Sequence, residues 1–146
     1  MSKKYLLLIV LCVIAVAGAL IYTQMPAHDL KVGSSVVEIP KGYTILQQSE
    51  HGGVFVNGQN KITVYENENS TQDSIKDYAK KHKKDLLKNS TEKIAGVTVY
   101  KFVLKDNSTN QTKITHLFFD KHSTPYHIFF RGEYDAKAMN SIINSL

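Results

Sequence analysis

Residues 54–65 read VFVNGQNKITVY, and they predict the β-hairpin around which a sheet forms. The two flanks, Val54–Val56 and Ile62–Tyr65, are rich in β-branched and aromatic residues, which favour strands. Asn57-Gly58 between them is the strongest hairpin signal in the chain, because both residues tolerate the positive φ of a type I′ turn. The expected pairing is antiparallel.

Further strands are expected on both sides of this hairpin. Upstream, Val36–Ile39 predicts a short strand that ends at the turn residues Pro40-Lys41-Gly42. Downstream, four short segments rich in β-branched and aromatic residues are separated by turns or polar loops, which favours antiparallel neighbours. These segments are Glu92–Ile94, Val97–Leu104, Ile114–Phe119 and Tyr126–Phe130.

Two amphipathic helices are predicted. The first begins with Ser70 or Thr71 as its N-cap and ends near Asn89 and Ser90, and its apolar side recurs at helical spacing. That side contains Ile75, Tyr78, Ala79, His82, Leu86 and Leu87. The second helix closes the chain, with its apolar side made by Tyr134, Ala138, Met139, Ile142, Ile143 and Leu146.

This order of elements predicts an α+β fold. Strands joined by tight turns form an antiparallel sheet of about six to seven strands, and the two helices must bury their apolar sides on it. We therefore expect one sandwich domain over residues 34–146, preceded by a linker over residues 23–33 in which Pro26 interrupts any helix.

The segments VVEIPKGYTI (36–45), AGVTVYKF (95–102), LFFDKHSTPYHIFF (117–130) and the closing IINSL (142–146) resemble PsbP-like domains in order and spacing. The resemblance covers roughly residues 31–146. It implies an antiparallel sheet with helices on both faces. Domains of this kind serve as extrinsic assembly factors, lipoproteins and secretion adaptors, and they share no catalytic residues that map onto this chain.

The N-terminus contains an uncharged apolar stretch, Tyr5–Tyr22, of 18 residues. As a helix it is about 27 Å long, close to the hydrocarbon thickness of a bilayer. Lys3 and Lys4 precede it, and positive charge favours the cytoplasmic side. The prediction is a cytoplasmic stub over residues 1–4, a single transmembrane helix over residues 5–22, and a domain outside the cell membrane.

A cleavable signal peptide is the alternative interpretation of the same stretch. Small-residue cleavage patterns occur at Ala15-Val16-Ala17 and at Ala17-Gly18-Ala19. The apolar run continues through Leu20–Tyr22, whereas the apolar part of a signal peptide ordinarily ends before its cleavage site. We expect an uncleaved signal-anchor on this ground, and a secreted domain if cleavage occurs.

Charge and cysteine content exclude several classes of function. The net charge is +5, and the basic residues are nearly all Lys, with Arg131 the sole Arg. This mild excess and the external location argue against nucleic-acid binding. Cys12 is the only cysteine and lies in the apolar stretch, so the sequence predicts neither a disulfide framework nor a thiolate metal site.

Two groups of residues are candidates for sites on the surface. A run of lysines along the first predicted helix is either a solvated face or an electrostatic contact with an anionic membrane surface or cell-wall polymer; it consists of Lys80, Lys81, Lys83 and Lys84. Asn-x-Ser/Thr sequons exceed the number expected by chance and fall in predicted loops or helix ends, which suggests N-glycosylation; they are Asn69, Asn89, Asn107 and Asn110.

His116 and His127 lie on predicted neighbouring strands, as two ligands of a metal site do, but no third ligand has suitable spacing. The chain contains no nucleophile elbow and no phosphate-binding Gly-rich loop, so we expect no cofactor and no catalysis. The predicted function is a non-catalytic binding or assembly module that engages an external protein or wall polymer. The alternative is a carrier of a small apolar ligand, or a hydrolase, with a pocket between helix and sheet.

Overall fold

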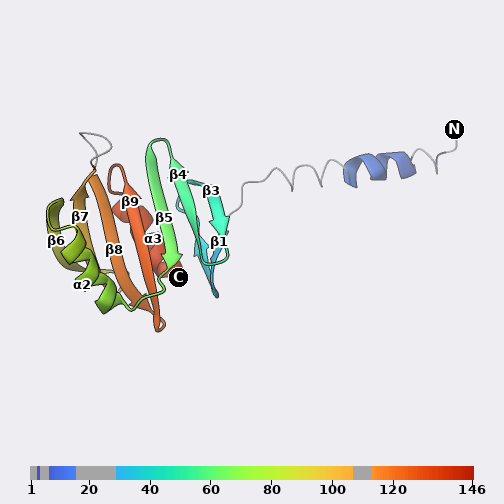
Figure 1. The fold of residues 1–146 in the computed structure, drawn as a ribbon. Helices are drawn as coiled ribbons and strands as arrows, with labels where there is room; N and C mark the ends of the chain where they lie inside the picture. The colour runs from blue at the N-terminus through green and yellow to red at the C-terminus, as the bar shows by residue number, and fades with distance from the viewer. Residues whose placement is uncertain (1–2, 4–6, 16–28, 107–112) are drawn as a thin grey trace.

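The computed structural model describes residues 3, 7–15, 29–106 and 113–146. Within these ranges the chain forms one antiparallel sheet of seven strands, a separate two-stranded hairpin, and helices that pack on the sheet (Figure 1). The predicted α+β class with an antiparallel sheet of six to seven strands is confirmed.

The sheet joins the two halves of the domain. Its strand order is β3-β4-β5-β9-β8-β7-β6. The last strand along the chain, β9, therefore lies at the centre of the sheet, between β5 and β8. Every neighbouring pair is antiparallel. The strands are β3 (Thr44–Ser49), β4 (Gly52–Asn57), β5 (Asn60–Glu66), β6 (Leu86–Ile94), β7 (Val97–Lys105), β8 (Lys113–Lys121) and β9 (Thr124–Arg131).

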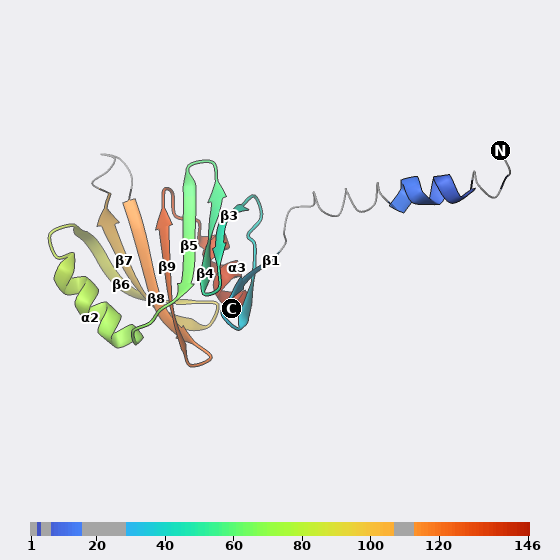
Figure 2. The same ribbon diagram turned by 45° about the vertical axis from the view of Figure 1, so that its right-hand side comes forward.

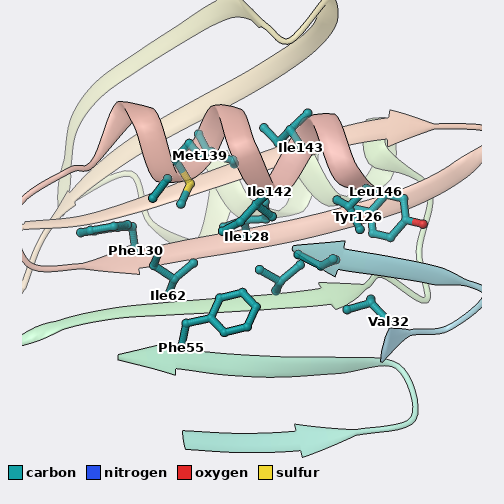
Figure 3. Close-up of a cluster of buried hydrophobic side chains, with 14 of the residues drawn as sticks. Val32, Phe55, Ile62, Tyr126, Ile128, Phe130, Met139, Ile142, Ile143 and Leu146 are labelled. Carbon is teal, nitrogen blue, oxygen red and sulfur yellow. The ribbon is translucent and has the colours of Figure 1, made fainter. Parts of the chain in front are cut away.

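One face of the sheet carries the hydrophobic core. The helix α3 (Ala136–Ser145) buries Met139 and Ile142 against Ile128 and Phe130 of β9 (Figure 3). The hairpin of β1 (Asp29–Val32) and β2 (Ser35–Glu38) adds Leu30 and other buried aliphatic side chains to the same cluster. Burial of each such side chain stabilises the fold by about 1.5–3 kcal/mol, so this face holds the domain together.

The opposite face is covered in part by α2 (Thr71–Lys81), which packs on β8. Side chains alternate along a strand, so Leu117 and Phe119 enter the core while Phe118 between them contacts Tyr78 of α2. Figures 1 and 2 show α2 and α3 on opposite sides of the sheet.

The first amphipathic helix is shorter than the sequence predicts. Its N-cap is Ser70, as expected, but it ends at Lys81, and Leu86 and Leu87 belong to β6 instead. The extension to Asn89 is therefore wrong. From Leu86 onward the backbone pairs with β7, and the Lys105 N–H donates to the Asp85 carbonyl at 3.0 Å. Nonlocal strand pairing outweighs the local helical spacing of two leucines.

Two strands were not predicted, and one predicted strand lies in a different sheet. Val36–Ile39 corresponds to β2, which pairs with β1 rather than with the main sheet. Strand β1 falls at residues expected to be linker, and β3 supplies the edge strand of the main sheet. The side chains of β3, TILQQS, are mostly exposed. The segment therefore has no alternation of apolar and polar residues from which a strand could be predicted.

The predicted hairpin is confirmed, but its turn is displaced by one residue. Asn57 pairs with Asn60, which leaves Gly58 and Gln59 as the two turn residues. Gly58 has a φ of +59° and Gln59 does not have a positive φ. A glycine with positive φ at the first turn position is the pattern of a type II′ turn, so the expected type I′ turn at Asn57-Gly58 is wrong.

Residues 7–15 form a helix whose apolar side chains are exposed. Among the described residues, no helix is both long and apolar enough to cross a membrane. Residues 5, 6 and 16–22 of the predicted span lie outside the described ranges, so the expected transmembrane helix remains a prediction.

Candidate functional site

Helix α2 is held on the sheet by polar contacts along its first two turns. The Thr71 hydroxyl donates to Asp120 Oδ1 at 2.8 Å, and Gln72 Nε2 donates to the Tyr100 hydroxyl at 3.3 Å. Before the helix, Asn67 Nδ2 donates to the Ser74 hydroxyl at 2.8 Å. These contacts fix the helix over β7 and β8 and so determine what lies beneath it.

A chain of three polar side chains lies beneath α2. His116 Nδ1 and His127 Nε2 are 2.8 Å apart, and His127 Nδ1 is hydrogen-bonded to the Tyr65 hydroxyl. The three residues come from β8, β9 and β5, which are neighbours in the sheet. The sequence predicts the two histidines on neighbouring strands, and the structure also brings their side chains together on one side of the sheet. It gave no signal for Tyr65, because the pairing of β5 with β9 is nonlocal.

Aromatic rings enclose the histidine pair. The Tyr78 ring from α2 lies 4.6 Å from the His116 ring and 5.2 Å from the Phe118 ring, measured between centroids. Phe118 stacks on His127 at 4.2 Å with an interplanar angle of 14°. Tyr78 thus covers the pair from the helix side, while His116 also stacks on Phe129 from the sheet.

Burial and contact keep both histidines neutral. Burial lowers the pKa of His127 to about 4, and burial together with the neighbouring His127 and His82 lowers the pKa of His116 to about 3. A hydrogen bond between two imidazoles requires one N–H and one lone pair, and neutral rings supply this. Protonation of both rings would place two N–H groups against each other at 2.8 Å.

The pair does not have the geometry of a metal site. Two nitrogen ligands of a tetrahedral Zn²⁺ ion are about 3.3 Å apart, because each is about 2.0–2.1 Å from the ion. The 2.8 Å separation corresponds to a hydrogen bond instead. Among the described residues, no group of three or more His, Cys, Asp or Glu side chains is arranged to hold a metal ion.

A cleft of about 410 Å³ opens beside this cluster, between the N-terminal half of α2 and the sheet. The aromatic rings of Tyr65, Tyr78, Phe118 and His127 form its inner wall, and polar residues form its rim. The rim residues are Asn67, Asn69, Asp73, Ser74 and Asp77. The hypothesis of a pocket between helix and sheet therefore corresponds to a specific place, although the pocket is lined by aromatic and acidic residues rather than by aliphatic ones.

The second candidate site is one end of the sheet, where basic residues of several strands converge. Lys105 lies directly opposite Lys113 in the pairing of β7 with β8, and Lys61 lies opposite Arg131 in the pairing of β5 with β9. Like charges placed directly opposite each other destabilise a sheet. The Arg131 charge is offset in part by Asp106, whose carboxylate lies 3.5 Å from Arg131 Nε.

The turn after α2 adds to this end of the sheet, since Asp85 in that turn accepts from the Lys105 N–H. Of the predicted lysine run, Lys83 and Lys84 lie in this turn, whereas Lys80 and Lys81 lie in the last turn of α2; all four are exposed. We use "the basic end" for the basic residues at this end of the sheet: Lys61, Lys83, Lys84, Lys88, Lys105, Lys113 and Arg131.

A groove of about 1060 Å³ adjoins the basic end on the α3 side of the sheet. Four basic side chains line it, with two acidic side chains and three neutral hydrogen-bonding ones. They are Lys88, Lys101, Lys113 and Arg131, then Asp106 and Glu133, then Gln59, Asn60 and Thr115. The Tyr134 ring also lines the groove, and Lys101 Nζ lies 4.1 Å above the centre of that ring. Burial, with Glu92 and Asp135 nearby, raises the pKa of Tyr134 to about 12, so the phenol remains neutral.

The sequons have different outcomes. The Asn69 side chain is exposed just before α2, at the rim of the cleft, and the Asn89 side chain is exposed on the edge strand β6. The expected position of Asn89 at a helix end is wrong, because β6 replaces that helix. Asn107 and Asn110 lie outside the described residues. Both described sequons are sterically open to modification.

Comparisons with known proteins give a fold relative and no family. No family model matches the chain, and no curated protein matches it. The solved structure of a protein from Bacteroides thetaiotaomicron VPI-5482 is similar over 83% of this chain, with a TM-score of 0.53 and 13% sequence identity. The match covers 48% of that protein, so the chain spans about half its length. At this identity the likeness concerns the fold alone.

Proposed function

We propose that this chain is a non-catalytic binding module that engages an anionic polysaccharide of the cell envelope through the basic end and the adjoining groove. The observation that carries this proposal is that two pairs of like charges lie directly opposite each other in the sheet. These pairs are Lys105 with Lys113 and Lys61 with Arg131. Such pairs cost stability, so the presence of two of them at a single end of the sheet favours a functional role.

The groove favours a polysaccharide over a flat bilayer surface. A polymer chain enters a concave surface that a membrane cannot reach, and sugar hydroxyls match the amide and hydroxyl groups of Gln59, Asn60 and Thr115. The Tyr134 ring, half-buried beside them, offers an apolar face to a sugar ring. Carboxylates or phosphates on the polymer would pair with Lys88 and Lys113 at the rim.

The N-terminal segment supports a location close to such a polymer. As an uncleaved anchor with Lys3 and Lys4 inside, it would hold the domain against the outer face of the cell membrane. Electrostatic attraction at moderate salt extends about 10 Å, so a tethered module needs its ligand nearby. The PsbP-like pattern agrees with this role, because domains of that kind act by binding rather than by catalysis.

Binding of hyaluronate and of neutral dextran of equal length to the full chain, purified in a neutral detergent, tests the proposal. We expect hyaluronate to bind with an affinity that falls as salt increases, and dextran to bind much more weakly. The Lys88→Gln/Lys113→Gln variant should bind hyaluronate about tenfold more weakly, which corresponds to about 1.4 kcal/mol.

The matched control is the Lys31→Gln/Lys93→Gln variant, which removes the same charge from exposed residues of β1 and of the far end of β6. It should bind hyaluronate as the natural chain does. Equal weakening in both variants would mean that net charge alone acts, and equal binding of dextran would contradict a role for the lysines.

A further inference from the structure

We propose that the cleft between α2 and the sheet binds a small organic cation, such as the trimethylammonium group of a choline-like ligand. This site lies under the N-terminal half of α2 and shares no lining residue with the groove at the basic end. The inference therefore does not rest on the proposed polysaccharide binding, and either can fail without the other.

The cleft wall consists of aromatic rings in several orientations. Tyr65 meets His127 edge to face, with 4.9 Å between centroids and an interplanar angle of 68°. Tyr78 is tilted by 57° against Phe118 at 5.2 Å. Tyr65, Tyr78, Phe118 and His127 line the cleft, and an aromatic ring that contacts a cation attracts it by about 0.5–2 kcal/mol.

The only ionised side chains that line the cleft are acidic. Asp73 and Asp77 are four residues apart on α2 and so lie on the same side of the helix. The one other titratable group with a charged form near neutral pH is His127, and burial keeps it neutral by lowering its pKa to about 4. Although the net charge of the chain is +5, no Lys or Arg of the described residues lines this cleft.

Helix capping explains one of these carboxylates but not both. Asp73 lies in the first turn, where its charge favours the helix N-terminus, and its Oδ2 accepts from the Ser70 hydroxyl at 2.9 Å. Asp77 lies mid-helix. Its ion pair with Lys81 joins side chains that are 61% and 66% exposed, and a pair of this kind is weak and exchangeable. Asp77 can therefore turn to a ligand cation at little cost.

Two donors in the cleft are already engaged, and no Lys or Arg of the described residues lines it, so the cleft is better suited to a cation than to an anion. The Tyr65 hydroxyl is hydrogen-bonded to His127, and the Asn67 side-chain amide donates to the Ser74 hydroxyl. A metal ion fits less well, because aromatic faces provide no ligand atoms. A volume of about 410 Å³ accommodates a trimethylammonium group and excludes a polymer chain.

Titration of the full chain in dodecyl maltoside with choline, and separately with its neutral isostere 3,3-dimethyl-1-butanol, tests the proposal. The measurement is isothermal calorimetry, with NMR chemical shifts of Tyr65, Tyr78 and Phe118 to locate the site. We expect choline to bind at least about tenfold more tightly than the neutral isostere, since ring faces and carboxylates act on the charge. The largest shifts should fall on those three rings.

Three variants separate the charge from the ring wall. Asp73→Asn/Asp77→Asn should weaken choline binding at least about fivefold, and Tyr78→Leu should do the same. Glu68→Gln is the matched control, because Glu68 is exposed between Asn67 and Asn69 but does not line the cleft. It should leave binding unchanged. Circular dichroism should confirm that each variant is folded.

Tyr78 packs on several rings, so its loss can disturb the fold. The aspartate variant changes only exposed side chains of α2, so it still tests the proposal if Tyr78→Leu does not fold. The proposal is overturned if choline does not bind, if the neutral isostere binds equally well, or if the aspartate variant binds choline as the natural chain does. Undiminished hyaluronate binding by the same aspartate variant would show that the two sites are separate.

Discussion

At the scale of single residues, the buried histidine pair is the most unusual feature of the domain. His127 is 7% exposed and hydrogen-bonded on both ring nitrogens, to Tyr65 and to His116. Buried polar groups are ordinarily satisfied in this way, because an unpaired one costs about 1–3 kcal/mol. The site therefore stabilises the neutral form of both histidines and disfavours their protonated form.

This arrangement predicts a loss of stability in mild acid. The folded-state pKa values of His116 and His127 lie below the unfolded value of 6.5, so the unfolded chain binds protons first as the pH falls. The stabilisation from the neutral histidine pair is complete above pH 6.5. It is lost as the pH falls toward the folded-state pKa values of about 4 and 3. The groups that face the pair from other elements are Tyr65 of β5, and Tyr78 and His82 at α2.

Urea denaturation at pH 7, 5.5 and 4.5 measures this effect. We expect the free energy of unfolding of the natural chain to fall by on the order of 1–3 kcal/mol across that range. The His116→Gln/His127→Gln variant cannot titrate there and should show a flatter dependence, whatever its stability at pH 7. Identical slopes for the two proteins would show that carboxylates alone account for the acid sensitivity.

At the scale of elements, α2 and α3 have similar N-caps, but among the hydrogen bonds of the described residues only the α3 cap also contacts a distant part of the chain. Ser70 caps α2, where its hydroxyl accepts from the Asp73 N–H at 3.2 Å. Asp135 caps α3, where Oδ1 accepts from the Ala138 N–H at 3.0 Å and Oδ2 accepts from the Tyr43 hydroxyl at 3.2 Å. Asp135 thus ties the start of α3 to the segment that leads into β3.

We therefore expect Asp135→Ala to destabilise the domain more than Ser70→Ala. Loss of an N-cap costs about 1 kcal/mol, and the lost Tyr43 contact adds about 1 kcal/mol at Asp135. Chemical denaturation at pH 7 gives both values, and Asn140→Ala at an exposed position of α3 is the neutral control. If Ser70→Ala costs as much as Asp135→Ala, the link from Tyr43 to α3 carries no stability.

The strand β6 shows how an element is decided by its partner. The segment from Leu86 to Ile94 contains two leucines at positions that continue a helical pattern, and most of its side chains are exposed or half-buried. Burial does not alternate along its first residues, so the local sequence identifies a strand only at the end of the segment, over Glu92–Ile94. Pairing with β7 over its whole length supplies the hydrogen bonds that decide the structure.

At the scale of the whole molecule, charge is segregated along α2 and across the sheet. Carboxylates line the cleft at the beginning of the helix, and lysines gather beyond its end, next to the basic end. A cation and an anionic polymer would therefore be bound at separate places on one small domain. The sum of charges in the sequence hides this separation, because opposite charges cancel in the total.

The state of the mature chain is predicted from its N-terminus and its sequons. Intact mass and N-terminal sequencing of protein isolated from its native host measure both. We expect a chain that retains residues 5–22 as a membrane anchor and carries glycans at Asn69 and Asn89, since both side chains are exposed. A sequence beginning near Leu20 would indicate a secreted domain, and a mass equal to that of the bare chain would exclude glycosylation.

The sequence by itself determined the fold class, most strands of the sheet, the start of α2, and α3 except for Tyr134, which precedes the Asp135 cap and so lies outside the helix. These features depend on local patterns: alternation in VTVYKFVL, the cap at Ser70, and the apolar spacing of Met139, Ile142 and Ile143. Sequence also placed His116 and His127 on neighbouring strands, because a short turn separates the two segments; the register that brings the two side chains together is a finding of the structure.

Only the tertiary structure decided what lies together across the sheet. The pairing of β5 with β9 brings Tyr65 to His127 and Lys61 to Arg131, although more than 60 residues separate the members of each pair. The packing of α2 on β8 then sets Tyr78 over the histidines and creates the cleft beside Asp73 and Asp77. Local sequence patterns do not predict such contacts. The contacts form because distant segments are stabilised more by packing and pairing with each other than by local interactions alone.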